Sequence, residues 1–290
     1  MVENKGSDKR FNYIVLLLML AFAFVTCLPL LYVLANSFSS AKMVNKGAVF
    51  LIPREFTLEN YAKILSNNAI LTGFRNTLFY VFMGTIIQLV LQFTAAYPLS
   101  RRDMKGRSAF SFYFSLTMFV SGGMIPTYIV VKGLNMLNTV WAMIIPGCVS
   151  VFNVIVIRTF MQSLPWEMQE AAMLDGCGNI RIFLTIVLPL CRAIIAVMLL
   201  YAIVGYWNAY FNSLLYITND DLFPLQRVIQ RILVANDASS SGDIGIGEQG
   251  LTSEVLKYVT IVVSSVPLIV IYPFFNKYFE TGLMIGGLKG

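Results

Sequence analysis

The chain has 290 residues, of which 57% are hydrophobic and only 12% charged, and its formal net charge is +6. This composition excludes an ordinary soluble domain and predicts an integral membrane protein. The absence of histidine removes the commonest general base and metal ligand, and the four cysteines are isolated, so no metal or disulfide framework is expected.

Six windows without charged side chains predict membrane-spanning helices, because one charge at the centre of a span costs about 2.5 to 3.5 kcal/mol. Each window reaches or approaches the roughly 20 residues that cross about 30 Å of hydrocarbon. The first is too long for a signal-peptide core and has no convincing cleavage site, so we interpret it as a retained helix. The windows run over about 11–35, 76–100, 108–131, 133–157, 193–219 and 258–276, within a transmembrane domain over 11–281.

Short basic loops predict the orientation of these spans. The loop "RRDMKGR" over 101–107 carries four positive side chains, whereas the connection between the third and fourth windows has only Lys132. Basic loops face the cytoplasm, so both termini are expected inside, and the net charge is better explained by topology than by nucleic-acid binding. The expected cytoplasmic parts are the tails over 1–10 and 282–290 and the loop over 163–190; the expected extracellular loops are 36–75 and 220–257.

The windows contain uncharged polar and aromatic residues but no charge, which disfavours a carrier coupled to protons or sodium. Two interpretations stay open for the polar groups: hydrogen bonds between helices, or a path for a neutral, hydroxyl-rich solute. The aromatic residues of the fifth window can stack on sugar rings or form an interfacial belt. The candidate path residues are Gln88, Gln92, Asn153, Tyr206, Trp207, Asn208, Tyr210, Phe211 and Asn212.

The loop over 163–190 predicts a helix, a sharp turn and a second helix outside the membrane. Pro165 suits a first helical turn, and Glu167 and Glu170 complement the positive end of the helix dipole. Gly176 can end the helix in a left-handed conformation, Gly178 can keep the turn tight, and Asn179 can cap the second helix.

The first helix of this loop also has a narrow apolar stripe, made by Leu164, Met168, Ala171 and Ala172. A helix of about ten residues is marginal alone in water, so it needs a partner. Docking into a groove of another protein and packing along the lipid headgroups both fit the composition.

Spacing in this loop resembles the signature loop in the membrane subunits of ATP-binding-cassette (ABC) importers. The matching identities are Glu170, Ala171, Ala172, Asp175, Gly176, Ile186, Leu188 and Pro189. In that family the short helix is a coupling helix, which inserts into a cleft of the ATPase subunit. The resemblance implies that coupling involves Glu167, Glu170, Ala171, Ala172, Asp175, Gly176 and Gly178.

The likeness covers nearly the whole chain, including "FTLENY", "SGGMIPTY", "WNAYFNSLLYI", "FPLQRVIQRIL" and the terminal "KYFETGLMIGGLKG". These segments resemble the shorter permease of maltose-type carbohydrate importers, in the branch that imports oligosaccharides from complex polysaccharides. The resemblance implies an all-α, type I ABC importer permease fold with six transmembrane helices in a bacterial cytoplasmic membrane. Ala193 stands where relatives often have a proline, so a softer kink is expected before the fifth span.

The resemblance also implies a non-catalytic subunit with several partners. Its expected partners are a second, homologous permease, two ATPase subunits, an extracellular solute-binding protein and the lipid bilayer. The chain has no G-x-x-x-x-G-K-[ST] phosphate loop, so ATP and Mg are expected on the ATPase subunits and no cofactor on this chain. The alternatives are the same machinery with a peptide, amino acid or phosphate as cargo, and an ATP-independent channel or carrier.

Two extracellular features complete the prediction. Leu58, Tyr61, Ala62 and Leu65 predict an amphipathic helix on the outer membrane surface, and the serine- and glycine-rich stretch from Ala238 to Gly250 predicts a mobile loop.

Overall fold

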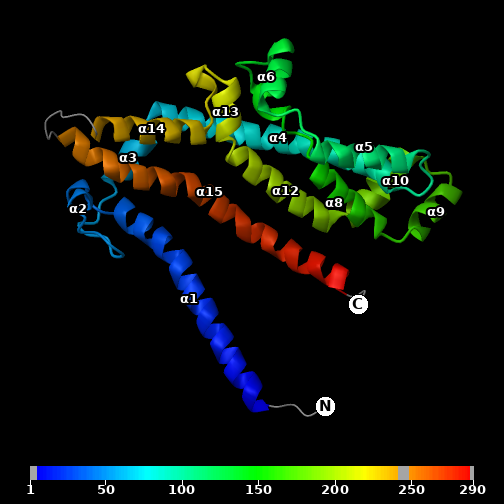
Figure 1. Cartoon of the computed structure of the whole chain (residues 1–290), viewed down its shortest axis with the longest axis horizontal. Coiled ribbons are helices and arrows are strands. Elements are labelled where there is room, and N and C mark those ends of the chain that lie inside the picture. The colour runs from blue at the N-terminus through cyan, green and yellow to red at the C-terminus, as the bar shows by residue number, and fades with distance from the viewer. Residues whose placement is uncertain (1–4, 241–247, 288–290) are drawn as a thin grey trace. The chain divides into compact units, whose positions relative to one another are not determined.

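The computed structural model describes the backbone of residues 5–240 and 248–287 and the side chains of residues 11–234 and 254–275. Within these ranges all regular structure is helical and no strand occurs (Figure 1), so the predicted all-α class is confirmed. The predicted mobile loop over 238–250 includes residues 241–247, and the two predicted tails include 1–4 and 288–290; these lie outside the described residues.

The helices and the one π-helical turn (η1) and one 3-10 turn (η2) have the following bounds: α1 Lys5–Ser37, α2 Ala41–Asn45, α3 Glu59–Leu65, α4 Asn68–Ser100, α5 Arg107–Phe119, α6 Met124–Gly133, α7 Val140–Ile144, α8 Val151–Gln162, α9 Glu167–Leu174, α10 Asn179–Ile182, η1 Phe183–Val187, α11 Leu188–Leu190, α12 Arg192–Trp207, α13 Tyr210–Tyr216, η2 Asp220–Leu222, α14 Leu225–Ser240 and α15 Glu248–Gly287. They divide into two compact units, residues 1–68 with 229–266 and residues 69–228 with 267–290.

Three helices in the described part of the chain are long and apolar enough to cross a membrane: Phe11–Ser37, Asn68–Ser100 and Glu254–Phe275. Two bent pairs raise the number to five if each pair is one span. These are Arg107–Phe119 with Met124–Gly133, bent by 112°, and Asn179–Leu190 with Arg192–Trp207, bent by 82°. The predicted number of six, and the predicted cytoplasmic termini, stay predictions.

Two of the predicted windows are not single helices. The window over 108–131 breaks between α5 and α6, where Gly123 has a φ of 82°. The window over 133–157 contains Asn135 and Asn138 with φ of 55° and 57°, followed by the short helix α7 and the start of α8. Glycine and asparagine tolerate this left-handed conformation, which no continuous helix contains.

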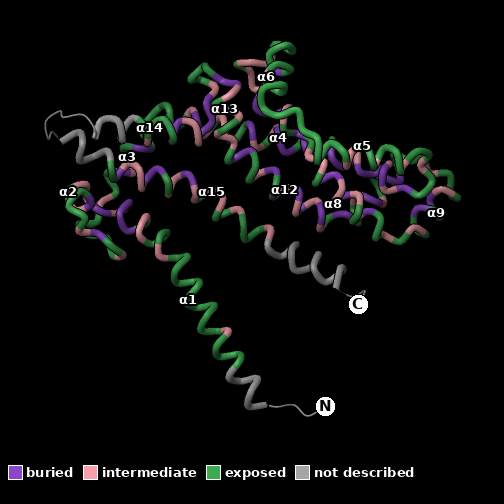
Figure 2. The backbone as a smooth tube through the Cα atoms, in the orientation of Figure 1, coloured by how far each residue is buried: buried purple, intermediate pink, exposed green. Residues whose placement is uncertain are grey.

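The first unit contains α1 and the segment that follows it. The apolar side chains of α1 are exposed along most of its length (Figure 2), as expected of a helix whose surroundings are lipid or other apolar partners. At its end, the hydroxyl groups of Ser37 and Tyr61 lie 2.8 Å apart, and the Phe38 ring stacks on Tyr61 at 5.1 Å. The predicted amphipathic segment forms α3, in which Ile64 is buried and Leu65 is exposed; Leu58, just before the helix, is also exposed.

The second unit is organised around α4, whose 33 residues correspond to a length of about 50 Å. Near its start, Tyr80 donates a hydrogen bond to the carbonyl of Leu222 at 2.8 Å, and Thr77 accepts one from the backbone of Leu225 at 2.8 Å. The middle of α4 approaches α12 closely: a Cβ at Gly84 would lie 2.5 Å from Cζ of Tyr206. These contacts fix the first half of α4.

The other half of α4 lies in the hydrophobic core of this unit. There α4, α8 and α12 pack together with the segment from α9 to α11, and α5 also packs on α8. The buried members of this core are Phe93, Ala96, Tyr97, Leu99, Val154, Ile157, Met161, Ala172, Ile182, Phe183, Val187, Cys191, Ile194 and Met198. The predicted cytoplasmic loop is therefore built into the helix bundle.

Candidate functional site

The first helix of the predicted coupling loop is α9. It begins at Glu167, so Glu167 and Glu170 occupy its first turn as predicted and complement its dipole. Pro165 was expected in that first turn but precedes the helix. The indole of Trp166, the residue after Pro165, donates a hydrogen bond of 2.6 Å to the Glu170 carboxylate. This bond joins the residue before the helix to its first turn.

The end of α9 is a Schellman turn. Gly176 has a φ of 78°, and its N–H donates to the carbonyl of Met173 at 3.0 Å. The N–H of Cys177 donates to the carbonyl of Ala172 at 2.9 Å. This pair of bonds requires a left-handed residue at position 176, so the predicted role of Gly176 in ending the helix is confirmed in its geometry.

Two local predictions beyond this turn differ from the structure. Gly178 has a φ of −71°, which any residue adopts, so the turn does not require glycine there. Asn179 is the first residue of α10 and makes no side-chain capping bond, so the predicted cap at Asn179 is wrong. Its carbonyl instead accepts a hydrogen bond from the Tyr97 hydroxyl at 3.3 Å.

The two faces of α9 have different environments. Ala172 and Gln169 are buried, with 7% and 6% of their surface exposed, and Met173 packs partly into the core. On the opposite face Ala171 is exposed, and Leu174 is 89% exposed. The structure thus separates the two alanines that the predicted apolar stripe combined.

The exposed face of α9 is more apolar than the predicted coupling set. Met168 and Leu174 lie on it, and Ile180, just after the turn, is 77% exposed. We call Met168, Ala171, Leu174 and Ile180 the apolar face. The motif does not include Met168, Leu174 or Ile180. Helical spacing indicates the first two, because residues 168, 171 and 174 recur every three positions on one face of α9.

Arg101 connects α4 to α9, and sequence reasoning assigned it only to the basic loop. Only 5% of its surface is exposed. Its guanidinium donates to both carboxylate oxygens of Asp103 at 2.8 and 2.5 Å, to the Tyr97 hydroxyl at 2.9 Å and to the Met173 sulfur at 3.4 Å. It also lies 5.6 Å from the centre of the Trp166 ring. A single buried cation therefore contacts the end of α4 and both ends of α9.

The electrostatics of this pair follow from its geometry. The hydrogen bond from Arg101 lowers the pKa of Asp103 below its ordinary value, more than partial burial raises it. The same hydrogen bond, opposed by burial, raises the pKa of Arg101. Both groups are therefore charged across the physiological range.

The return path from α10 to α12 is buried on one side. Ile182, Phe183 and Val187 are core residues, and the Phe183 ring lies 4.7 Å from the Tyr97 ring. The helical turns widen to π geometry over Phe183–Val187, and the axis bends by 82° before Arg192. The bend is sharp, so the softer kink that the resemblance predicted at Ala193 is wrong.

The candidate path residues fall into two groups in the structure. Gln88, Gln92, Asn153, Tyr206 and Trp207 are buried within the second unit. Gln92 donates to the Cys148 carbonyl at 3.5 Å and Tyr206 donates to the Ile144 carbonyl at 3.2 Å, so both join neighbouring segments. These contacts favour the helix-to-helix interpretation for Gln92 and Tyr206.

The remaining candidates lie around α13. Asn208 and Phe211 are exposed, whereas Tyr210 and Asn212 are half-buried. The guanidinium of Arg227 lies 5.8 Å from the centre of the Tyr210 ring, which holds that ring in place. These side chains are accessible in the second unit, and their contact with a solute stays a prediction.

The described residues include no group of three or more histidine, cysteine, aspartate or glutamate side chains that could hold a metal ion. The site around α9 consists of one buried arginine, a capped helix and an apolar face.

The chain is similar to bacterial sugar-transport permeases over its whole length. It is 36% identical over 289 residues to the protein LplC of Bacillus subtilis, covering 100% of this chain and 98% of LplC. It is also 36% identical over 287 residues to the polygalacturonan/rhamnogalacturonan transport system permease protein YtcP of Bacillus subtilis, covering 98% of this chain and 99% of YtcP. No family model matches the chain.

The fold is similar to that of a solved importer subunit. A chain in the crystal structure of a bacterial ABC transporter involved in the import of the acidic polysaccharide alginate superposes with a TM-score of 0.86 at 27% identity. The match covers 96% of this chain and 99% of that chain. From its identity with full-length relatives and this structural match, the chain belongs to the membrane permeases of ABC sugar importers.

Proposed function

We propose that this chain forms half of the translocation pathway for an oligosaccharide and receives the force of ATP hydrolysis through α9. The observation that carries this proposal is the apolar face of Met168, Ala171, Leu174 and Ile180. An exposed apolar face on a short helix outside the predicted spans is suited to a groove of another protein.

The opposite face of α9 explains how a movement of the helix reaches the membrane. Ala172 and Met173 pack into the core that contains α4, α8 and α12, and Arg101 joins Met173 to the end of α4. Close-packed interiors transmit displacement because they cannot be compressed. A push on the apolar face therefore displaces these helices together.

The remaining parts of the machine are proposed from the family. A second permease completes the pathway, two ATPase subunits bind ATP and Mg, and this chain itself is non-catalytic and binds no cofactor. A second solved neighbour, with the same fold, is a chain of a bacterial alginate ABC transporter in complex with a pentasaccharide-bound periplasmic protein. An extracellular binding protein that delivers the cargo, and a bacterial cytoplasmic membrane as the location, are proposed on this basis.

The proposed cargo is an oligosaccharide released from a larger polysaccharide. The name of the relative YtcP, a polygalacturonan/rhamnogalacturonan transport system permease protein, supports a cargo of this class. In this chain Asn208 and Phe211 offer an exposed amide and an exposed aromatic ring, next to the positioned ring of Tyr210. These exposed groups can stack on a sugar ring and bind its hydroxyls, whereas Gln92 and Tyr206 are buried and therefore less suited to contact a sugar. Replacing Phe211 by alanine should raise the KM for uptake while the stability of the importer is unchanged.

The coupling proposal is tested with Leu174→Asn in the assembled importer, reconstituted in liposomes. The variant removes apolar surface from α9 without touching the core, so assembly of the membrane domain and its thermal stability should be unchanged. Uptake and substrate-stimulated ATP hydrolysis should both fall strongly. Glu170→Lys, at the start of the same helix, should also stop uptake.

The matched control is Leu65→Asn, which removes an exposed leucine from α3 in the predicted extracellular loop. This variant should retain uptake and ATP hydrolysis. Normal coupling in Leu174→Asn, or an equal loss in Leu65→Asn, would contradict the assignment of α9.

A further inference from the structure

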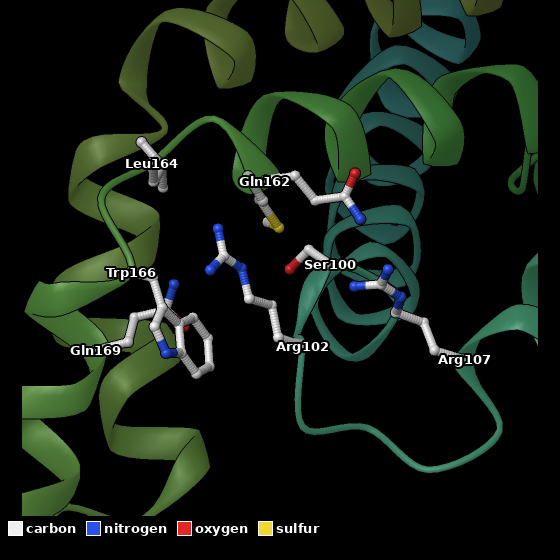
Figure 3. Close-up of a pocket in the computed structure, with 8 residues that line it drawn as sticks. Ser100, Arg102, Arg107, Gln162, Leu164, Trp166 and Gln169 are labelled. Carbon is white, nitrogen blue, oxygen red and sulfur yellow. The ribbon is translucent and has the colours of Figure 1, made fainter.

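A cavity of about 360 Å³ lies beside the start of α9 (Figure 3). It is at the end of α4, where Ser100 lines it, and Arg102 and Arg107 line it from the predicted cytoplasmic loop and the first turn of α5. Figure 3 shows the Arg102 side chain extending between Ser100 and the Leu164–Trp166 segment. The volume of the cavity is at the lower end of the range of about 300 to 1,000 Å³ for small-molecule sites.

The charge of this cavity is positive and unopposed. Its lining includes Arg102 and Arg107 but no carboxylate. The nearby Asp103 is already paired with Arg101. Arg102 makes no hydrogen bond or ion pair with any residue that the structure describes, and Arg107 donates only a 3.3 Å bond to the carbonyl of Arg101. The cavity therefore presents two guanidinium groups with donors to spare.

A third arginine adds to this imbalance. Arg158 of α8 has a buried Nε atom without a hydrogen-bond partner among the described residues. Burial, and next the positive charge of Arg107, lower the pKa of Arg158. A bound anion beside Arg107 would offset this repulsion.

The location favours a lipid. The cavity lies at the predicted cytoplasmic end of α4, next to Trp166, a residue type typical of the membrane interface. Basic pockets among helix ends on this side of a membrane attract anionic headgroups. The phosphodiester of such a headgroup supplies the anion that the two arginines of the lining lack.

We propose that this cavity binds the phosphate of an anionic lipid headgroup such as that of phosphatidylglycerol. Arg102, whose side chain extends between Ser100 and the Leu164–Trp166 segment, holds the phosphate oxygens, and the positive charge of Arg107 on the same wall adds to the attraction. The lipid then fills the space between the end of α4 and the start of α9. The site is independent of which sugar is carried.

The test measures lipid retention by native mass spectrometry on the assembled importer, purified from vesicles of phosphatidylcholine doped with phosphatidylglycerol. The wild type should retain phosphatidylglycerol, and Arg102→Ala should retain about fivefold to tenfold less, the loss expected for one arginine beside an anionic headgroup. Arg107→Gln should have a similar effect. Lys105→Ala is the matched control, because it removes one charge from the same loop but does not line the cavity; it should bind like the wild type.

Excess inorganic phosphate distinguishes the sources of the phosphate group. Retention that survives it assigns the cavity to the lipid headgroup, whereas displacement assigns it to free phosphate. Equal retention in Arg102→Ala and the wild type, with unchanged thermal stability, would overturn the proposal. An equal loss of lipid in Lys105→Ala would also overturn the proposal, since the effect would then come from general surface charge. A defect of Arg102→Ala that is confined to ATPase assembly would overturn it as well.

Discussion

Replacing Gly176 by alanine isolates the contribution of one backbone conformation to the coupling helix. Position 176 has a φ of 78°, and a Cβ placed there meets no atom within 4 Å. The substitution therefore creates no clash, and its cost is only the strain of a left-handed alanine, about 1 to 2 kcal/mol. That energy corresponds to a factor of about 5 to 30 in the population of the open turn.

Amide hydrogen exchange on the assembled importer measures this opening directly. The N–H groups of Gly176 and Cys177 close the Schellman turn, so the amides at these two positions should lose protection by about 5-fold to 30-fold in Gly176→Ala. Gly176→Asn should lose less, because asparagine tolerates the left-handed region. Gly176→Val should lose more, because a branched side chain does not.

The matched control is Gly178→Ala, two residues further along the same turn. Its φ of −71° suits alanine and its surroundings are also open, so protection should be unchanged or slightly increased. Equal effects of the two substitutions, or full protection in Gly176→Ala, would refute the assignment of the turn to backbone conformation.

Further predictions concern the contacts around α4. Arg101→Gln should lower the free energy of unfolding by about 1 to 3 kcal/mol, because it removes the charged hydrogen bonds of a buried guanidinium to Tyr97 and Asp103, whereas Asp103→Asn should cost below about 1 kcal/mol because that carboxylate is half exposed; thermal unfolding of the importer separates the two. The pKa of Asp103 is lowered in the folded state, so its stabilisation is present above the ordinary aspartate pKa of about 3.9 and is lost as the pH falls through the lower folded value; the stability difference between wild type and Asp103→Asn should close on acidification, and a widening difference would contradict the ion pair. Gly84→Ala should cost about 1 to 3 kcal/mol by collision with Tyr206, and removing that ring in a double variant should make the two effects less than additive. Full additivity would show that the close approach is not limiting.

Local features of the coupling loop were predictable because they depend on neighbouring residues. Glu167 and Glu170 at the start of α9 and the left-handed Gly176 follow from helix chemistry over a few positions. The burial of Gln169 and Arg101 was not predictable, because it depends on which helices meet at the end of α4. Hydropathy treats both residues as polar and therefore exposed.

The predicted spans show the same division. Counting charges located the apolar windows but could not detect a backbone break inside one. Gly123 and Asn135 carry the positive φ angles at which two windows are interrupted, and both are residue types that adopt them. Such residues inside an apolar window indicate where a helix can break, whereas the 112° bend itself depends on tertiary packing.

Site-specific crosslinking measures directly whether the apolar face of α9 contacts the ATPase. In a permease whose four cysteines are replaced by serine, Leu174→Cys and Gln169→Cys place single thiols on the exposed and buried faces of the same helix. The thiol at position 174 should crosslink to the ATPase subunit, with a yield that changes when ATP binds, whereas the thiol at position 169 should not. Absence of any crosslink at position 174 in an importer that still takes up sugar would contradict this contact.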